Sequence, residues 1–404
     1  MIKKLLSTNL YTLALYMRKI ASAFVVFIAA RFLDVHGYGL YSSYRTIALY
    51  ILVLANLGFS EYIIVSSQKK VENVALKQRF FIVFGILVAL FYACFQSFFN
   101  LENHLVFALL IFNMFFDNSF FALILPYFQV TKKFKEISLI NIVYAVGIIA
   151  IACISYIFKL GLTKFLILNV LWGVFNFVQS SIRIKASYIK GLRQFKEFFK
   201  SLDKSMVYFA LVALTILTYS QLPSLAVSTL LSREDAALYF SAFNIASVLA
   251  LVSAAQSQQI IADLMNNSYS LLKKVLKKNI LFVLKINIAA TLFFIVAGKP
   301  LLEIIYGNEY YQNAYFALVI PAFAQTVGSV GAVAGTYITA RNMQKSKFKM
   351  QLEFVAVTFL LLAALKKFGL TGMVWTFALS QVYTASRYTI FMLNDLKKLR
   401  NKEA

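Results

Sequence analysis

Long apolar stretches alternate with short polar segments along the whole chain. A helix rises ~1.5 Å per residue, so about 20 apolar residues are needed to cross the hydrocarbon core of a membrane. The pattern therefore predicts an all-α membrane protein with twelve transmembrane helices. The predicted spans are 8–31, 39–66, 80–99, 104–130, 137–158, 163–182, 205–228, 237–264, 279–298, 311–339, 350–366 and 370–394.

Basic residues alternate between the two sides of this predicted membrane domain. The termini and the even-numbered loops contain most of the lysines and arginines, whereas the odd-numbered loops contain most of the acidic loop residues. Lys and Arg mark the cytoplasmic side of a membrane protein. Both termini are therefore predicted to be cytoplasmic, which agrees with an even number of spans.

Five residues of the second predicted span recur 198 positions later, in the eighth. They are Leu40, Tyr41, Ser43, Ile47 and Ala48, matched by Leu238, Tyr239, Ser241, Ile245 and Ala246. The offset is close to half the chain length and predicts two six-helix lobes, 1–200 with the basic cytoplasmic connector and 201–404. Because six is even, both lobes keep the same orientation in the membrane, which defines a parallel internal repeat of the kind found in some transporters.

The composition supports a membrane protein and excludes several other classes. Hydrophobic residues make up 61% of the chain and charged residues 14%, far from the composition of soluble proteins. A net charge of +24 often indicates nucleic-acid binding, but here the basic residues are divided among short loops between spans. We therefore expect no nucleic-acid partner.

The sequence also lacks the usual marks of an enzyme. Its two histidines and two cysteines show no metal-ligand spacing. It contains no ATP-binding phosphate loop, and no outer loop is long enough to form a glycosyltransferase or polymerase site. We expect a transporter that uses no metal or organic cofactor, with H⁺ or Na⁺ as a possible coupling ion.

Membrane-buried basic residues are the first candidates for a binding site, because an ionisable group inside a membrane is costly unless it is paired or hydrated. Arg18 and Lys19 lie near the centre of the first span, about 15 Å of helix from its cytoplasmic start. They are expected to face an aqueous cavity, with snorkelling or internal pairing as the alternative. Arg45 lies about 9 Å inside the outer face on the second span. The candidate substrate-binding residues are Arg18, Lys19, Arg31, Arg45 and Arg387.

Two of these arginines and the buried acidic residues also have structural interpretations. Arg31 lies near the surface, where an ion pair with an adjacent aspartate is favoured, and Arg387 is within reach of the interface by snorkelling. Asp117 in the fourth span is either a proton or cation site or the partner of a buried arginine. Glu61 and Asp263 occupy comparable places near the inner ends of spans two and eight, where a structural pair is the alternative to ion coupling. We retain Asp117, Glu61 and Asp263 as candidate ion-coupling residues.

Two further patterns concern how the helices pack. Gln256 and two other glutamines make the middle of the eighth span polar, which either a lined cavity or interhelical hydrogen bonding explains. Gly328, Gly331 and Gly335 place small residues on one face of the tenth span. Such a face is typical of close helix packing.

These features together resemble the Wzx-type O-antigen and polysaccharide flippases of the multidrug/oligosaccharidyl-lipid/polysaccharide exporter superfamily. The resemblance covers essentially the whole length and is carried by the twelve spans in two halves and by short segments. These are Arg18-Lys19, Arg31-Phe32-Leu33, Gly37-Tyr38-Gly39-Leu40-Tyr41 and Leu57-Gly58-Phe59.

The resemblance implies a flippase that moves an undecaprenyl-pyrophosphate-linked oligosaccharide across the bacterial inner membrane. The cargo would be an O-antigen repeat unit of lipopolysaccharide or a capsule repeat unit. A cationic cavity between the lobes, in which we place Arg18 and Arg45, would open alternately to each side, as an antiporter coupled to H⁺ or Na⁺ or driven by the membrane potential. Membrane lipids, a polysaccharide polymerase and a chain-length regulator would be its partners.

Three other classes fit the residues less well. A cation-coupled multidrug exporter of the same superfamily would favour acidic and aromatic cavity residues, whereas the mid-membrane charges here are mostly positive. A glycan polymerase or transferase would need a large outer loop. A purely structural membrane protein would need neither buried arginines nor a duplicated core.

Overall fold

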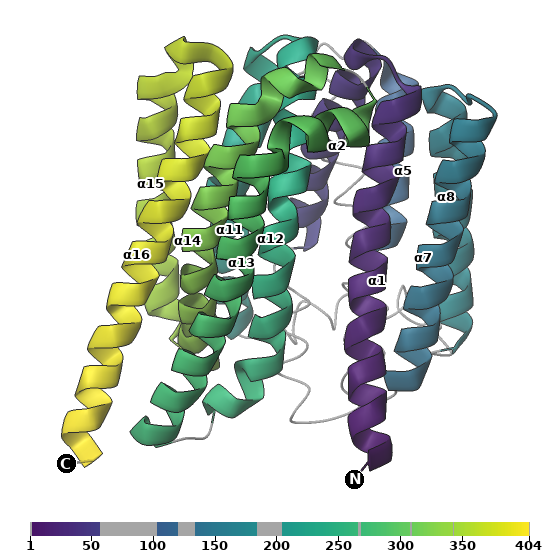
Figure 1. The fold of residues 1–404 in the computed structure, drawn as a ribbon. Helices are drawn as coiled ribbons and strands as arrows, with labels where there is room; N and C mark the ends of the chain where they lie inside the picture. The colour runs from purple at the N-terminus through teal and green to yellow at the C-terminus, as the bar shows by residue number, and fades with distance from the viewer. Residues whose placement is uncertain are drawn as a thin grey trace. The chain divides into compact units, whose positions relative to one another are not determined.

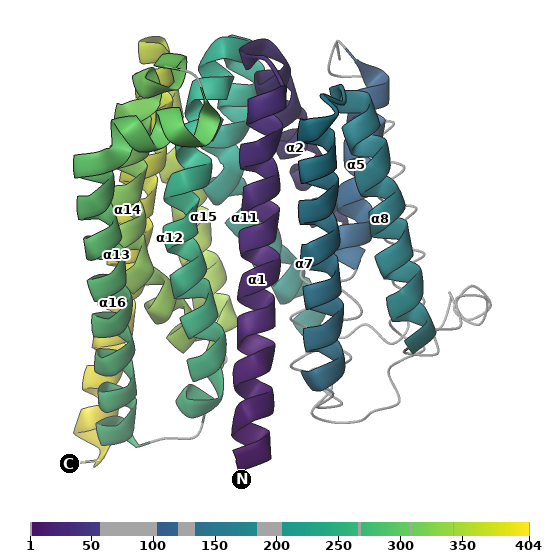
Figure 2. The same cartoon turned by 45° about the vertical axis from the view of Figure 1, so that its right-hand side comes forward.

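The computed structural model describes residues 2–56, 103–119, 134–183, 204–265, 268–307, 309–341 and 343–403. Within these ranges the regular structure is helical and no strand occurs (Figures 1 and 2). The helices are α1 (Ile2–Phe32), α2 (Val35–Asn56), α5 (His104–Ser119), α7 (Phe134–Ile157), α8 (Leu162–Arg183), α11 (Lys204–Leu230), α12 (Arg233–Met265), α13 (Tyr269–Tyr306), η3 (Glu309–Ala314), α14 (Tyr315–Ala340), α15 (Gln344–Leu365), η4 (Lys366–Phe368) and α16 (Gly369–Glu403).

Six segments of the described chain are long and apolar enough to cross a membrane. They are Lys135–Ile157, Leu162–Arg183, Leu211–Leu230, Tyr269–Tyr306, Tyr311–Ala340 and Gln344–Asn401. The all-α prediction is confirmed for the described residues. Each predicted span except 80–99, which lies outside them, overlaps one of the described helices. The number of spans, the repeat and the cytoplasmic termini stay predictions.

The chain divides into two compact units, residues 1–214 and 215–404. In unit 1, α1 packs along α7, and the two helices lie side by side in both ribbon views. The α5 helix contacts α2 and α8. Aromatic rings also join helices of this unit: Phe165 of α8 meets Phe32 of α1 and Tyr41 of α2 edge to face, and Tyr44 of α2 meets Phe107 of α5 in the same way. Such pairs add packing energy beyond the apolar area that they bury.

In unit 2, α14 contacts α12, α13 and α16, and α15 packs against α16. Small residues allow the close approach of α14 to α16. A Cβ atom added at Gly331 would lie 2.5 Å from the Ala385 Cα, too close for any side chain. Close packing, which the glycine pattern predicted for this face, is therefore confirmed at Gly331.

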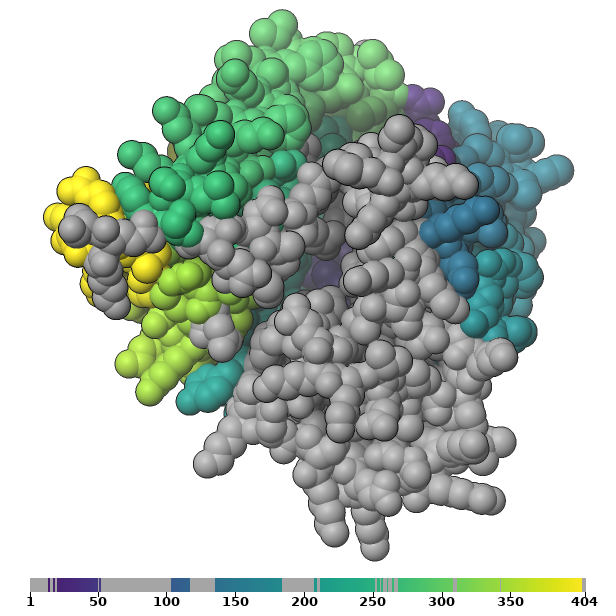
Figure 3. All heavy atoms as spheres, turned by 90° about the horizontal axis from the view of Figure 1, so that it is seen from below, coloured from purple at the N-terminus to yellow at the C-terminus, as the bar shows by residue number. Residues whose placement is uncertain are grey.

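Two helices of unit 2 are much longer than a membrane crossing requires. The α13 helix has 38 residues and α16 has 35, against about 20 for the hydrocarbon core. Leu272 and Leu276 of α13 and Leu396 of α16 belong to one buried cluster. Figure 3 shows these ends from below, with the end of α16 in yellow beside α13 in green. The lysines next to these leucines, at the start of α13 and near the end of α16, are exposed.

Candidate functional site

Arg18 is buried in unit 1, with 2% of its surface exposed. Its Nη1 donates a hydrogen bond of 3.2 Å to Asn141 Oδ1 on α7. Its guanidinium carbon lies 3.7 Å from the centre of the Tyr144 ring, also on α7. A guanidinium over an aromatic face is attracted by the ring quadrupole, more strongly where water is excluded. Arg18 therefore connects α1 to α7 through one charged hydrogen bond and one cation–π contact.

A cavity of about 220 Å³ lies beside this connection, entirely within unit 1. Helices α1, α2, α5, α7 and α8 all contribute to its wall. The polar side chains that line it are Ser22, Tyr41, Arg45, Asn113, Tyr144 and Asn169. Arg45 is the one cation among the described lining residues, and none of those residues is acidic. Tyr144 lines the cavity, and its ring contacts the guanidinium of Arg18. Arg45 therefore lines the cavity directly, and Arg18 lies behind a lining residue.

The chemistry of this cavity suits an anion. A guanidinium presents a planar fork of donors that matches the oxygens of phosphate or carboxylate. The apolar residues around Arg45, among them Val25 and Leu49, lower the local dielectric and strengthen that attraction. Serine and asparagine side chains in the wall offer further hydrogen bonds. The sequence singled out Arg45 by its depth in the second span, and the family resemblance placed it in a cationic cavity.

Other candidate residues lie elsewhere or outside the description. Arg31 is exposed at the end of α1. The neighbouring Asp34 accepts a hydrogen bond of 2.8 Å from the Gly37 backbone N–H and so caps the start of α2. The predicted pair between Arg31 and Asp34 stays a prediction. The side chains of Lys19, Asp117 and Asp263, and all of Glu61, lie outside the described residues.

Arg387 forms an ion pair that the sequence did not predict. Its Nε and Nη2 lie 3.0 and 2.7 Å from Glu353 Oε2 on α15. The two side chains are 38% and 43% exposed, and neither lines the unit 1 cavity or the unit 2 cavity described below. Glu353 was visible as an acidic residue inside the eleventh predicted span, but only packing shows that it faces Arg387.

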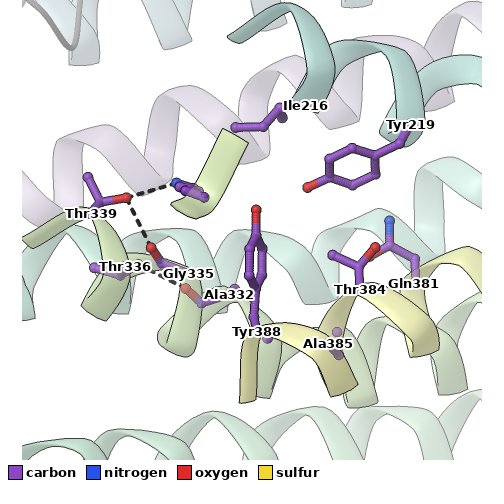
Figure 4. A pocket seen from close by; sticks show the side chains of 13 residues that line it. Ile216, Tyr219, Ala332, Gly335, Thr336, Thr339, Gln381, Thr384, Ala385 and Tyr388 are labelled. Atoms are coloured by element: carbon purple, nitrogen blue, oxygen red, sulfur yellow. Dashed lines mark hydrogen bonds between the residues drawn. The ribbon is translucent and has the colours of Figure 1, made fainter. Parts of the chain in front are cut away.

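Unit 2 contains a second cavity, of about 250 Å³, between α11, α14, α15 and α16 (Figure 4). Its polar lining consists of Tyr219, Thr336, Thr339, Lys347, Gln381, Thr384 and Tyr388. Lys347 Nζ donates to Thr339 Oγ1 at 2.8 Å. This wall is therefore made mainly of neutral hydroxyl and amide groups, in contrast to the Arg45 cavity.

A connection similar to that of Arg18 joins α11 to α15 in unit 2. Thr215 Oγ1 donates to Gln351 Oε1 at 2.8 Å, and a tyrosine of α11 contacts the ring of Phe354. Gln351 and Phe354 lie 210 positions after Asn141 and Tyr144. The first and fifth predicted spans of each half are thus joined at matching places, charged in unit 1 and neutral in unit 2. This correspondence supports the predicted repeat.

The polar middle of the eighth span is also partly explained. Gln256 donates a short hydrogen bond to Asn279 Oδ1 on α13, so interhelical hydrogen bonding accounts for this glutamine. The side chains of the other two glutamines lie outside the described residues. Within the described ranges, no group of three or more His, Cys, Asp or Glu could hold a metal ion.

Solved structures with a similar fold are membrane transporters. An inward-facing multidrug resistance MATE family transporter of the MOP superfamily matches with a TM-score of 0.72 and 12% identity, covering 96% of each chain. A MOP superfamily transporter from Pyrococcus furiosus, described as having reverse polarity of its binding pocket, matches at 0.66 and 12%, covering 98% and 96%. A Vibrio cholerae MATE transporter in its bent form matches at 0.60 and 14%, covering 97% and 98%.

These similarities show that the chain has the fold of these MOP-superfamily transporters. Residues 28–315 match the family described as "Polysaccharide biosynthesis protein". Because the match covers most of the chain, the protein belongs to that family. No curated protein sequence matches it. The family resemblance inferred from the sequence is therefore confirmed.

Proposed function

We propose that the protein is a flippase that moves an undecaprenyl-pyrophosphate-linked oligosaccharide from the inner to the outer leaflet of the bacterial inner membrane. Its family supports a role in polysaccharide biosynthesis, and its fold is that of transporters that carry substrates across membranes. The cargo would be an O-antigen or capsule repeat unit. Alternating access would expose the cargo first to one side and then to the other.

The observation that carries this proposal is the cationic wall of the unit 1 cavity. A pyrophosphate-bearing lipid presents negative charge, and Arg45 offers the donor fork that phosphate oxygens accept. Arg18 adds a second positive charge behind Tyr144. A low-dielectric site that contains a cation, and no acidic group among its described lining residues, repels a cationic drug and attracts an anionic lipid.

The membrane potential would assist this direction of transport. Moving negative charge outward across a membrane that is negative inside is favourable by roughly 2.3 kcal/mol per charge per 100 mV. Two uncompensated pyrophosphate charges would therefore contribute about 4–5 kcal/mol at 100 mV. Antiport of H⁺ or Na⁺ is the other energy source, with Asp117, Glu61 and Asp263 as candidate coupling residues. No organic cofactor is proposed, and a polysaccharide polymerase and a chain-length regulator are proposed as partners.

The second candidate is a cation-coupled multidrug exporter. The similar solved structures described as multidrug transporters favour it. Such a substrate would require acidic groups in its binding cavity, and none of the described residues lining either cavity is acidic. We therefore rank the lipid-linked oligosaccharide first.

Complementation of a flippase-null strain tests the proposal. Wild-type protein is expected to restore surface polysaccharide, and Arg18→Ala and Arg45→Ala are expected to lose it at matched expression. Restoration by all three would retain the flippase and leave these arginines with a structural role. Failure of the wild type, together with export of a cationic drug by the same cells, would favour the multidrug exporter.

A further inference from the structure

The cavity of unit 2 differs in chemistry from the Arg45 cavity, although the two lie in corresponding halves of the chain. Its described polar lining is rich in hydroxyl groups, contributed by Thr336, Thr339, Thr384, Tyr219 and Tyr388. We propose that this cavity is a subsite for the uncharged sugar residues of the cargo. The proposal rests on the proposed function and adds that the glycan is bound separately from the pyrophosphate.

The strongest sign of a missing ligand is Thr384. Its side chain is 6% exposed, and its Oγ1 has no hydrogen-bond partner among the described residues. Buried hydroxyl groups are normally paired, because leaving one unpaired is unfavourable. Thr384 lies in the wall of the cavity (Figure 4). A sugar hydroxyl in the cavity would supply the partner, since it can both donate and accept.

Tyr388 belongs to a hydrogen-bond network at the wall of the same space. Its oxygen accepts a hydrogen bond of 2.9 Å from Gln351 Nε2, and Gln351 in turn accepts one from Thr215. The Tyr388 hydroxyl is also hydrogen bonded to that of Tyr219. This bond uses one of the two phenol protons, so the pair keeps one O–H for another acceptor. In Figure 4 the hydroxyls of Tyr388 and Tyr219 point toward one another from opposite walls of the cavity. The pair can therefore donate one hydrogen bond to a hydroxyl group of a sugar ring.

Glycines keep the α14 wall of the cavity free of side chains. Gly328, Gly331 and Gly335 of α14 contribute no side chain to the cavity wall. A Cβ added at Gly335 would touch the Tyr388 ring at 3.4 Å, so an alanine there would occupy space beside that ring. An aromatic ring together with a few directed polar groups is the usual composition of a small-molecule site.

The charge of the lining residues favours a neutral sugar over a pyrophosphate or a cationic drug. Lys347 is the one cation among the described lining residues, and it donates to Thr339. A pyrophosphate is better matched by the guanidinium of the unit 1 cavity. A cationic drug would require a carboxylate, which none of the described lining residues supplies. An uncharged polyhydroxylated ligand remains, and a neutral sugar has that chemistry.

A binding assay with two lipid probes tests this subsite. The probes are undecaprenyl pyrophosphate and its glycan-bearing form. The glycan-bearing lipid is extracted from the source strain after deletion of the gene for this protein. Binding to the full-length protein in detergent is compared for wild type, Tyr388→Phe, Thr384→Val and Thr384→Ser. The matched control is Thr358→Val, because Thr358 is buried on α15, bonds to the Phe354 carbonyl and does not line the cavity.

Wild type is expected to bind the glycan-bearing lipid at least tenfold more tightly than the bare lipid. Tyr388→Phe and Thr384→Val each remove one neutral hydrogen bond, so each should weaken glycan-lipid binding about three- to tenfold. Binding of the bare lipid should change less than twofold. Thr384→Ser keeps the hydroxyl and should bind as wild type does, as should Thr358→Val. Thermal unfolding of each variant establishes that it is folded.

Two outcomes overturn the subsite. Equal affinity of wild type for the two lipids would show that the protein does not bind the glycan. Variants that keep the full preference for the glycan-bearing lipid would place the glycan elsewhere. Either result leaves the flippase proposal intact, because the bare lipid still binds. Failure of wild type to bind both lipids would overturn the proposed function together with the subsite.

Discussion

Gly331 lies on α14 where this helix packs directly against the backbone of α16, and its substitution by alanine gives a calculable effect. The added Cβ would lie 2.5 Å from the Ala385 Cα and 2.9 Å from its Cβ. Carbon atoms in good contact are about 3.5–4.0 Å apart, so the two helices must separate by about 1 Å. Neither neighbouring atom belongs to a flexible side chain, so no rotamer change relieves the overlap.

We expect Gly331→Ala to lower the free energy of unfolding by about 1–2 kcal/mol. Overpacking costs about 1–3 kcal/mol, and the better helix propensity of alanine offsets up to about 1 kcal/mol of it. At roughly 2–4 °C per kcal/mol for a domain of this size, the unfolding temperature should fall by about 2–8 °C. Thermal unfolding of the purified protein in detergent measures this shift.

Two further variants separate the helix packing from a general effect of alanine. Gly328→Ala is the matched control, because its added Cβ would meet only the ends of the Gln381 and Gln325 side chains, at 3.3 and 3.9 Å. It should unfold close to the wild-type temperature. Adding Ala385→Gly to Gly331→Ala should restore only part of the loss, since the backbone of α16 still lies too close to the new methyl group. A Gly331→Ala protein as stable as wild type would refute the close packing of α14 on α16.

The remaining predictions concern the charged groups. Arg18→Met removes a cation–π contact worth about 0.5–2 kcal/mol and a charged hydrogen bond worth about 1.5–3 kcal/mol. Relief of the desolvation cost of the charge leaves a net loss of about 2 kcal/mol, and a variant that melts at or above the wild-type temperature would contradict the Arg18–Tyr144–Asn141 connection. Arg45→Gln should reduce surface polysaccharide at least tenfold while the protein melts normally, and Arg45→Lys should retain part of the activity because it keeps the charge but loses the fork. Full activity of Arg45→Gln would remove this residue from the binding site. For Arg387 and Glu353, both partly exposed, a double-mutant cycle with glutamine should give a coupling below about 1 kcal/mol. If the pair is structural, any loss of activity in Arg387→Gln comes from the unpaired Glu353, so the double variant should export polysaccharide better than an impaired Arg387→Gln. A double variant as inactive as Arg387→Gln would instead indicate substrate binding by Arg387.

The helices themselves could be predicted from the sequence, because the length and apolarity of a membrane span are set by the thickness of the membrane. Arg45 could be chosen as a candidate for a related reason, since a buried cation must find water or a partner, and the family resemblance placed it in a cavity. The close packing at Gly331 followed from the spacing of three glycines. Each of these predictions depends on residues that are near one another along one helix.

The partners across helices could not be predicted in the same way. Arg18 contacts Asn141 and Tyr144 on a helix more than a hundred residues away in the sequence. Arg387 pairs with Glu353 only because of the way that α15 packs on α16. The unit 2 cavity was missed for a further reason. Thr and Tyr are common in membrane helices, where a threonine hydroxyl usually bonds to its own helix, so Thr384 carried no signal until its surroundings were known.

Movement of the lipid between leaflets tests the central claim most directly. The protein is reconstituted in liposomes with the glycan-bearing undecaprenyl pyrophosphate, and an impermeant glycan-modifying reagent reports the fraction exposed on the outer leaflet. Wild-type protein should exchange the lipid between leaflets, faster under a potential negative on the side that the lipid leaves, and Arg45→Gln should slow the exchange at least tenfold. Exchange no faster than in protein-free liposomes, together with transport of a cationic dye by the same preparation, would contradict the account.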